Sequence, residues 1–407
     1  MNLLKNLPDI KNARRIGILG GAFDPIHYGH LAAAEGARQE MGLDFVLFIP
    51  TGQPSHKNTA TFSEHRYLMT ALAVADNPHF HVSRMELDRQ GPSYTIDTLR
   101  ILKEETDVEL FFIVGADEMM QIMHWKDAYD LLSICQWAAA TRPGYDIQAL
   151  SDHVAKLSAS HGLQAHILKI PGLDISGTAL RNRIIDGRFV KYLIPPAVEG
   201  YLRDLGLYQN SQPQDEMILK TVAAKLSPKR YRHTLGVLET AIILAAHQGV
   251  DLRKTYLAAL LHDYAKELKA EEKRDLCKAF NIPLDPIQEQ YVNLMHGQLA
   301  AELARREFNI EDAEILEAIS YHTTGRAGMG KLEKIIKIAD NIEPNRPDYP
   351  GIEEIKALAG VDLDRGAAAS IKRDIQYTKE RGNAVHPWGL EALKDLDGLH
   401  QDYMEVK

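Results

Sequence analysis

The chain contains little cysteine: Cys135 and Cys277 are the only two among 407 residues. They lie far apart and have neither the spacing of a metal-binding pair nor that of a redox-active pair. The composition therefore excludes a disulfide-stabilised scaffold and a cysteine-based zinc site, and it fits the reducing cytoplasm, where we expect the protein. We expect Cys135 to lie in the hydrophobic core, because no catalytic partner accompanies it.

Long apolar runs and an excess of positive charge are also absent. Lys5, Pro8 and Asp9 interrupt the first apolar stretch, and no run reaches the roughly 18 to 20 residues that span a bilayer. Asp and Glu (56) outnumber Lys and Arg (47), and neither half of the chain is basic. We therefore expect no membrane segment and no extended nucleic-acid surface, although a local pocket for phosphates stays open.

The first half of the chain alternates strand-like and helix-like segments. Alternation of this kind predicts an α/β domain with a mostly parallel sheet covered by helices. Ligands of such sheets bind beyond the carboxyl ends of the strands, where Gly20 and Gly21 would lie. The predicted strands cover residues 16–19, 45–49, 80–82, 110–114 and 137–140.

The second half has helical patterns and almost no strand signal. A polar stretch over residues 209–215 separates the halves, so we place one domain at 1–210 and an all-helical domain at 211–407. The clearest helical patterns cover residues 231–247, 256–268, 299–308 and 332–342.

A glycine-rich motif follows the first predicted strand. Residues 20–30 read Gly-Gly-Ala-Phe-Asp-Pro-Ile-His-Tyr-Gly-His, and a helix is expected over 31–41. Glycines admit a phosphate close to the backbone, a helix N-terminus favours anions, and His27 and His30 add donors. The pattern is neither a P-loop nor a dinucleotide-binding fingerprint. It suits stabilisation of a phosphoryl group during transfer.

This motif resembles the signature of the nucleotidyltransferase superfamily, and further segments resemble the bacterial nicotinate-mononucleotide adenylyltransferases. The sequence departs from the family at Gly177, where a serine is usual, and at Leu180, where isoleucine is usual. The matching segments are His56-Lys57, Glu64-His65-Arg66, Ser93 to Leu99, Gly115-Ala116-Asp117 with Trp125, Arg142-Pro143 and Ile175 to Arg181.

The resemblance implies a Rossmann-like domain that transfers AMP from ATP, with Mg2+, to nicotinate mononucleotide. His27 and His30 would stabilise the transition state, and Arg181 would act with them. Independently of the resemblance, Ser176 is a good N-cap for a helix to about residue 185, which would bring Thr178 and Arg181 near ATP phosphates. The residues expected to bind substrate are Gly20, Gly21, Phe23, Lys57, Thr95, Asp117, Trp125, Ser176 and Thr178.

A dispersed set of histidines and aspartates occupies the second half. Buried His and Asp are costly unless they are paired or bound to metal. Each residue of the set stands on or at the end of a helical segment, so several helices can converge on one centre. Nitrogen and oxygen ligands favour a pair of iron, manganese or similar ions over a structural zinc. The set is His233, His262, Asp263, His296, His322 and Asp340.

This pattern resembles the HD phosphohydrolase superfamily, in particular its YqeK-like branch, which hydrolyses diadenosine tetraphosphate to two ADP. The resemblance implies one metal on His233, His262, Asp263 and Asp340, and a second on Asp263, His296 and His322, with iron as the expected ion. Metal-activated water would attack a phosphorus of the bridge. Candidate phosphate-binding residues are Lys266, Arg326 and Arg346.

The sequence thus predicts a bifunctional enzyme with ATP, nicotinate mononucleotide and diadenosine tetraphosphate as substrates. One alternative keeps both folds but changes the substrates, to a different nucleotidyl acceptor and a general HD nucleotidase. In another, the HD domain only regulates or assembles its neighbour. The sequence leaves open whether identical chains associate.

Overall fold

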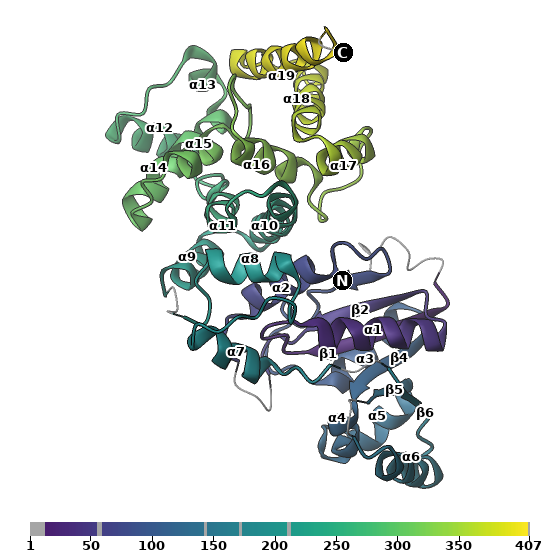
Figure 1. Ribbon diagram of the computed structural model, residues 1–407. Helices are drawn as coiled ribbons and strands as arrows, with labels where there is room; N and C mark the ends of the chain where they lie inside the picture. Colours follow the sequence, from purple (N-terminus) through teal and green to yellow (C-terminus); the bar gives the residue numbers. More distant parts are fainter. Residues whose placement is uncertain (1–12, 55–58, 142–144, 171–172, 210–212, 406–407) are drawn as a thin grey trace. The chain divides into compact units, whose positions relative to one another are not determined.

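The apolar segments of the first half form a six-stranded parallel sheet in the order β3-β2-β1-β4-β5-β6. The computed structural model describes residues 13–54, 59–141, 145–170, 173–209 and 213–405 (Figure 1). The chain divides into two units, Met1–Ser211 and Gln212–Lys407. The strands are β1 (Arg15–Gly21), β2 (Phe45–Pro50), β3 (Phe80–Val82), β4 (Glu109–Gly115), β5 (Gln136–Ala140) and β6 (Ala165–Leu168).

The five predicted strands are confirmed, and β6 is an additional strand that the sequence did not predict. β2 is buried along its whole length, as expected for a strand covered on both faces. Helices α3, α5 and α6 contribute to one buried cluster with β1, β2, β4 and β5, whereas α1 packs over the strands on the other side (Figure 1). The helices of this unit are α1 (Tyr28–Met41), α2 (Ser63–Val74), α3 (Thr95–Glu105), α4 (Ala116–Met120), the 3-10 helix η1 (Ile122–His124), α5 (Ala128–Ile134), α6 (Ile147–His161), α7 (Gly177–Ile185) and α8 (Pro196–Asp204).

Between β1 and β4, the side on which successive strands join the sheet reverses. β2 and β3 extend it on one side of β1, and β4, β5 and β6 extend it on the other. At such a switch point the connections leave in opposite directions and open a crevice at the carboxyl ends of the strands. Gly20, Gly21 and Gly115 end the two central strands there.

The described part of the second unit contains helices and no strand. Its centre is formed by α10, α11, α15 and α16, which contact one another. The helices are α9 (Pro213–Lys225), α10 (Pro228–Gln248), α11 (Leu252–Leu261), α12 (Ala270–Ala279), α13 (Pro286–Gln290), the 3-10 helix η2 (Val292–Leu294), α14 (Met295–Phe308), α15 (Ala313–Tyr321), α16 (Lys331–Ile342), α17 (Ile352–Val361), α18 (Leu363–Glu380) and α19 (Pro387–Glu405).

One predicted helix boundary was wrong. The helix expected over 256–268 ends at Leu261, and His262 is its C-cap, so His262 and Asp263 lie in the turn that follows α11. Apolar periodicity does not record where a chain leaves a helix to bring polar groups inward. The two units divide between Ser211 and Gln212, within the polar stretch 209–215. Helix α9 begins at Pro213, a residue type favoured in a first helical turn. Among the described residues, every helix is too short or too polar to span a bilayer.

Candidate active sites of the two units

A cavity of about 750 Å³ opens at the carboxyl ends of β1 and β4. The starts of α1, α3 and α7 also contribute to its wall, so three helix N-termini border it. Exposed N–H groups at these ends favour a polyphosphate. The predicted residues that line the cavity are Gly20, Gly21, Phe23, His27, His30, Thr95, Trp125, Ser176, Thr178 and Arg181.

His27 and His30 stack at the start of α1, with ring centroids 3.7 Å apart. The backbone N–H of His27 donates to Nδ1 of His30 over 3.3 Å. Because this nitrogen accepts, the proton of a neutral His30 ring lies on Nε2. Gly29 makes room for the stack, since a Cβ there would lie 3.0 Å from Nδ1 of His27. The pair therefore forms a fixed donor surface on the cavity wall.

Hydrogen bonds hold Arg181 against the glycine-rich segment. Its Nη1 donates to the carbonyl of Asp24 over 2.6 Å, and its Nη2 donates to Thr178 Oγ1 over 3.2 Å. Ser176 caps α7 by accepting from the N–H of Ala179. A Cβ at Gly177 would lie 3.0 Å from the Asp24 carbonyl oxygen and 3.3 Å from Arg181 Nη1. The departure at Gly177 thus leaves space for the contact between Asp24 and Arg181.

Arg66 fixes the loops around this cavity, a role that the sequence pattern did not reveal. Its side chain is 1% exposed and donates to the carbonyls of Ala22, Thr51 and Gly52, and also to that of Thr61. The guanidinium fork suits this task, because it offers several donors in a fixed plane.

Two predicted residues of the first site, Asp117 and Lys57, are not among the described residues that line the cavity. Among the described residues, Asp117 is exposed and does not line the cavity, although its neighbours Gly115 and Glu118 do. Lys57 lies outside the described residues, as do His56, Arg142 and Pro143 of the quoted segments.

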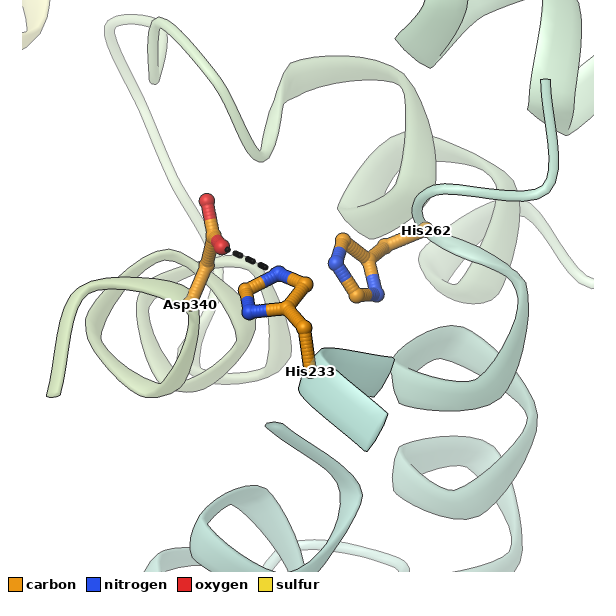
Figure 2. Close-up of side chains that lie close together, drawn as sticks. All are labelled: His233, His262 and Asp340. Atoms are coloured by element: carbon orange, nitrogen blue, oxygen red, sulfur yellow. Dashed lines mark ion pairs between the residues drawn. The ribbon is translucent and has the colours of Figure 1, made fainter. Parts of the chain in front are cut away.

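The six predicted metal ligands of the second unit converge. His233 on α10 faces Asp340 on α16, with Nε2 and Oδ1 3.1 Å apart, and His262 lies beside them (Figure 2). His233, His262 and Asp340 form one group of ligand atoms within 4.8 Å of one another, and His262, Asp263 and His322 form a second.

Asp263 stands between two pairs of histidines. Its Oδ2 lies 3.6 Å from Nε2 of His233 and 3.5 Å from Nε2 of His262. Its Oδ1 lies 3.1 Å from Nε2 of His296 and 3.6 Å from Nε2 of His322. One carboxylate thus directs one oxygen to each pair, which is the arrangement a bridging ligand requires.

The donor chemistry fits divalent cations. Nε2 of His262 is buried and has no hydrogen bond of good geometry among the described residues. Nε2 of His233 and Oδ1 of Asp263 are also buried, and each has its 3.1 Å contact within the ligand set itself, to Oδ1 of Asp340 and to Nε2 of His296. Buried polar atoms are rarely left without partners, so their convergence points to a cation. Imidazole nitrogens with carboxylate oxygens suit iron, manganese and zinc.

Electrostatics favour the ligating forms of four of these groups, His296, His322, Asp263 and Asp340. Burial, reinforced by the charge of Lys266, lowers the pKa of His296 to about 3, and burial also lowers the pKa of His322. Burial would raise the pKa of Asp263 and Asp340, but nearby cationic groups hold both pKa values well below the usual range. Two neutral imidazoles and two carboxylates are the protonation states that metals bind. At His233, burial would lower the pKa, but hydrogen bonds to Asp340 and Glu343 raise it to about 9, so this ring must lose a proton to bind a metal.

Cationic side chains surround the carboxylates. Nη1 of Arg230 lies 2.7 Å from Oδ2 of Asp263, and Nη2 of Arg346 lies 2.7 Å from Oδ1 of Asp340. Lys266 Nζ lies 3.2 Å from Nε2 of His296. Lys266 and Arg346 therefore lie directly beside the predicted metal ligands. Arg230, which was not among the predicted site residues, lies beside them too.

Arg326 has different partners. Its guanidinium contacts Glu333 at 2.7 Å and Glu317 at 2.9 Å, and Glu333 is 4% exposed. These contacts join the segment after α15 to α15 and α16 and occupy Nε and Nη2 of the guanidinium.

The chain matches two family profiles, one described as cytidylyltransferase-like over residues 18–183 and one described as HD domain over residues 230–345. The folds and the two sites thus define a nucleotidyltransferase unit joined to an HD-domain unit.

Relatives of the first unit identify the family more closely. A "Probable nicotinate-nucleotide adenylyltransferase" of Moorella thermoacetica is 47% identical over 199 residues, which cover 48% of this chain and 92% of the relative. A protein of the same name from Thermoanaerobacter sp. (strain X514) is 45% identical over 202 residues, covering 49% and 96%. The chain belongs to the nicotinate-nucleotide adenylyltransferase family, and it carries an HD domain in addition.

Solved structures resemble each half. A "predicted HD superfamily hydrolase involved in NAD metabolism" from Clostridium acetobutylicum is 36% identical, covers 45% of this chain and 96% of its own, and has a TM-score of 0.44. The Plasmodium falciparum nicotinic acid mononucleotide adenylyltransferase complexed with NaAD is 20% identical, covers 48% and 97%, and has a TM-score of 0.41.

Proposed function

We propose that the first unit transfers AMP from ATP to nicotinate mononucleotide, giving deamido-NAD and pyrophosphate. The observation that supports this most is the cavity in which His27, His30 and Arg181 meet at helix N-termini. Membership of the adenylyltransferase family supports the choice of acceptor.

In the proposed reaction, a phosphate oxygen of nicotinate mononucleotide attacks the α-phosphorus of ATP. The bond from that phosphorus to the oxygen bridging the β-phosphate breaks, and pyrophosphate leaves with the electron pair. Mg2+ accompanies ATP and shields the triphosphate. His27 and His30 donate to oxygens that gain charge in the transition state, and Arg181 and Lys57 hold phosphate oxygens. Gly20, Gly21, Phe23, Ser176 and Thr178 would contact ATP, and Thr95 and Trp125 would form the base and nicotinate pockets. Asp117, which was also expected there, does not line the cavity.

We propose that the second unit hydrolyses diadenosine tetraphosphate symmetrically to two ADP. The division of Asp263 between two histidine pairs supports two divalent ions, one held by His233, His262, Asp263 and Asp340 and one held by Asp263, His296 and His322. Iron is the proposed metal. Such ions polarise phosphate oxygens and lower the pKa of water.

This chain's own residues would orient the polyphosphate for hydrolysis. Lys266 and Arg346 offer cationic donors at the edge of the centre, and Arg326 is a third candidate that would first have to leave its glutamate partners. Water adds to one of the two central phosphorus atoms, and the bond to the oxygen between those phosphorus atoms breaks. That oxygen then becomes the terminal phosphate oxygen of the departing ADP.

The adenylyltransferase proposal is tested on the full chain with ATP and nicotinate mononucleotide, measuring pyrophosphate release. We expect His30→Ala to reduce the rate at least about 100-fold, because a donor to the developing charge is lost. Hydrolysis of diadenosine tetraphosphate should stay unchanged. His79→Ala, which removes an exposed histidine of the same unit, is the control. Absence of pyrophosphate release by the wild type, or a marked preference for another acceptor, would overturn the proposal.

The hydrolase proposal is tested with the same chain, by ADP formation and metal content. We expect the double variant His262→Ala/Asp263→Ala to lose both, while adenylyl transfer continues. His247→Ala, an exposed position on α10, is the control. Loss of metal with unchanged hydrolysis would refute the assignment of the site. A metal-bound wild type without hydrolysis would favour a regulatory or assembly role, and equal turnover of simple nucleotides would favour a general nucleotidase.

A further inference from the structure

Three of the four histidines at the metal centre are oriented by the backbone. Nδ1 of His262 and Nδ1 of His322 each lie 2.7 Å from the carbonyl oxygen three residues earlier, that of Ala259 and that of Ile319. Nδ1 of His296 has the same relationship to the carbonyl of Asn293. Donation from Nδ1 to a carbonyl leaves the lone pair of Nε2 for a metal, so local chain geometry fixes these three rings.

His233 is oriented differently. It lies within α10, and its Nδ1 contacts a side chain from far along the sequence, Oε1 of Glu343, at 3.1 Å. Glu343 is 2% exposed and directly follows α16, which carries Asp340. The carboxylate therefore has the position that backbone carbonyls have at the other three histidines.

Glu343 is itself fixed by its surroundings. Its Oε2 accepts from the backbone N–H of Asn345 over 2.6 Å and from Nδ2 of Asn345 over 3.0 Å. A Cβ at Gly236, one turn after His233 on α10, would lie 2.2 Å from Oε2. Glycine at position 236 is thus required for the carboxylate to approach the helix, and Oε1 remains directed at His233.

We propose that Glu343 is a positioning residue that holds His233 with Nε2 toward the metal, and that it controls one of the two metal subsites. This inference rests on the proposed metal centre. The affected ion is the one assigned to His233, His262, Asp263 and Asp340. The ion assigned to His296 and His322 relies on rings that backbone carbonyls fix, so it does not depend on Glu343. Outer carboxylates of this kind both orient an imidazole and strengthen it as a ligand.

The test is a titration of the metal-free full chain with Mn2+, measuring the number of bound ions and the affinity of each. For Glu343→Ala, we expect one of two sites to weaken roughly 10- to 100-fold and the other to stay unchanged. Glu343→Gln keeps an oxygen acceptor without its charge, so its affinity should lie between those of the wild type and Glu343→Ala. Gly236→Ala should act in the same direction, because it displaces the carboxylate without removing it.

Two controls separate positioning from general stability. Glu333→Gln removes the charge of another buried carboxylate, whose partners are Arg326 and the N–H of Gly330. Gly360→Ala adds a methyl group to a helix where nothing lies within 4 Å. Both should bind two Mn2+ ions as the wild type does.

Unchanged Mn2+ binding by Glu343→Ala, or equal weakening of both sites in Glu343→Gln, would overturn the inference. A wild type that binds no Mn2+ would overturn it together with the metal centre. A wild type that binds two ions without cleaving diadenosine tetraphosphate would refute only the proposed substrate, since the effect of Glu343 on metal affinity would still be measurable.

Discussion

The hydroxyl of Tyr208 donates a hydrogen bond of 2.6 Å to Oδ1 of Asp24, 184 residues earlier in the chain. Asp24 belongs to the glycine-rich segment, and its Oδ2 accepts from the N–H of Ala60 over 2.7 Å. Burial and the neighbouring carboxylate raise the pKa of Tyr208 well above its usual range, so the phenol remains a donor. The end of the first unit thus helps to fix the loop that carries the transfer site.

Replacing Tyr208 by phenylalanine should weaken this loop. The change leaves a buried carboxylate oxygen without its donor, which costs about 1 to 3 kcal/mol. We expect a matching loss in the free energy of unfolding of the first unit and slower pyrophosphate release, with diadenosine tetraphosphate hydrolysis unaffected. Denaturant titration and the two assays measure this. Tyr129→Phe, at a position 66% exposed, is the control, and equal effects of both variants would refute the role of the bond.

Arg66→Lys should be more damaging than its chemical similarity suggests. A lysine cannot reach the carbonyls of Ala22, Thr51 and Gly52 together, and each buried carbonyl left unpaired costs about 1 to 3 kcal/mol. We expect the free energy of unfolding to fall by more than about 3 kcal/mol. Arg203→Lys is the matched change at a side chain that is 73% exposed. A loss below about 1 kcal/mol at position 66 would contradict this account.

The sequence predicted most of the sheet because its strands are apolar and separated by helical patterns. β6 was missed because Ala165–Leu168 is short and forms an edge strand that is only partly buried. Its apolar signal in the sequence is therefore weak. Helix α11 was predicted too long, since apolar periodicity carries no mark of the turn that brings His262 and Asp263 inward.

The candidate site residues could be named where they form local motifs, as in residues 20–30 and 175–181, or where residue types typical of metal ligands recur on successive helices, as in the six predicted metal ligands. Contacts between distant segments carried no such signal. The bond from Tyr208 to Asp24 and the bond from His233 to Glu343 each depend on where the folded chain brings the second residue. Glu343 lies only three residues after Asp340 in the sequence, but a glutamate is equally common on a solvated helix end.

The carboxylate of Glu35 contributes to the free energy of unfolding of the first unit, and this contribution depends on pH. The hydrogen bond from Arg38 outweighs burial and lowers the pKa of Glu35 from its ordinary value of 4.5 to about 2. Since the folded pKa is the lower one, the contribution is complete above pH 4.5 and is lost as pH falls toward 2. The pair is partly exposed, so we expect Glu35→Gln to cost only about 1 kcal/mol at pH 7.

The difference between wild type and Glu35→Gln should shrink as the pH of denaturant titrations is lowered from 6 to 3. Glu216→Gln is a suitable comparison, because that carboxylate pairs with Lys220 on an exposed surface of the second unit. A difference that stays constant over this range would exclude the shifted pKa of Glu35 as its cause.

Both thiols should be unreactive in the folded chain. Burial raises the pKa of Cys135 to about 12 and also raises the pKa of Cys277. At pH 8 only about one Cys135 in ten thousand is then a thiolate, the form that reacts. We expect negligible labelling by a disulfide reagent at pH 8 and labelling of both residues in urea. Rapid labelling of one thiol in the native protein would show that it is accessible and has an ordinary pKa.

Metal removal should lower the stability of the second unit without unfolding it. Arg230 and Arg346 already pair with Asp263 and Asp340, so the carboxylates keep cationic partners when no ion is bound. Mn2+ at about 100 times its dissociation constant should then add about 2.7 kcal/mol per site by mass action. Calorimetry should show one transition that rises with Mn2+ and returns with chelator, while the transition of the first unit stays fixed. The double variant His262→Ala/Asp263→Ala should lose the Mn2+ response. A shift of both transitions, or of neither, would contradict a metal centre confined to the second unit.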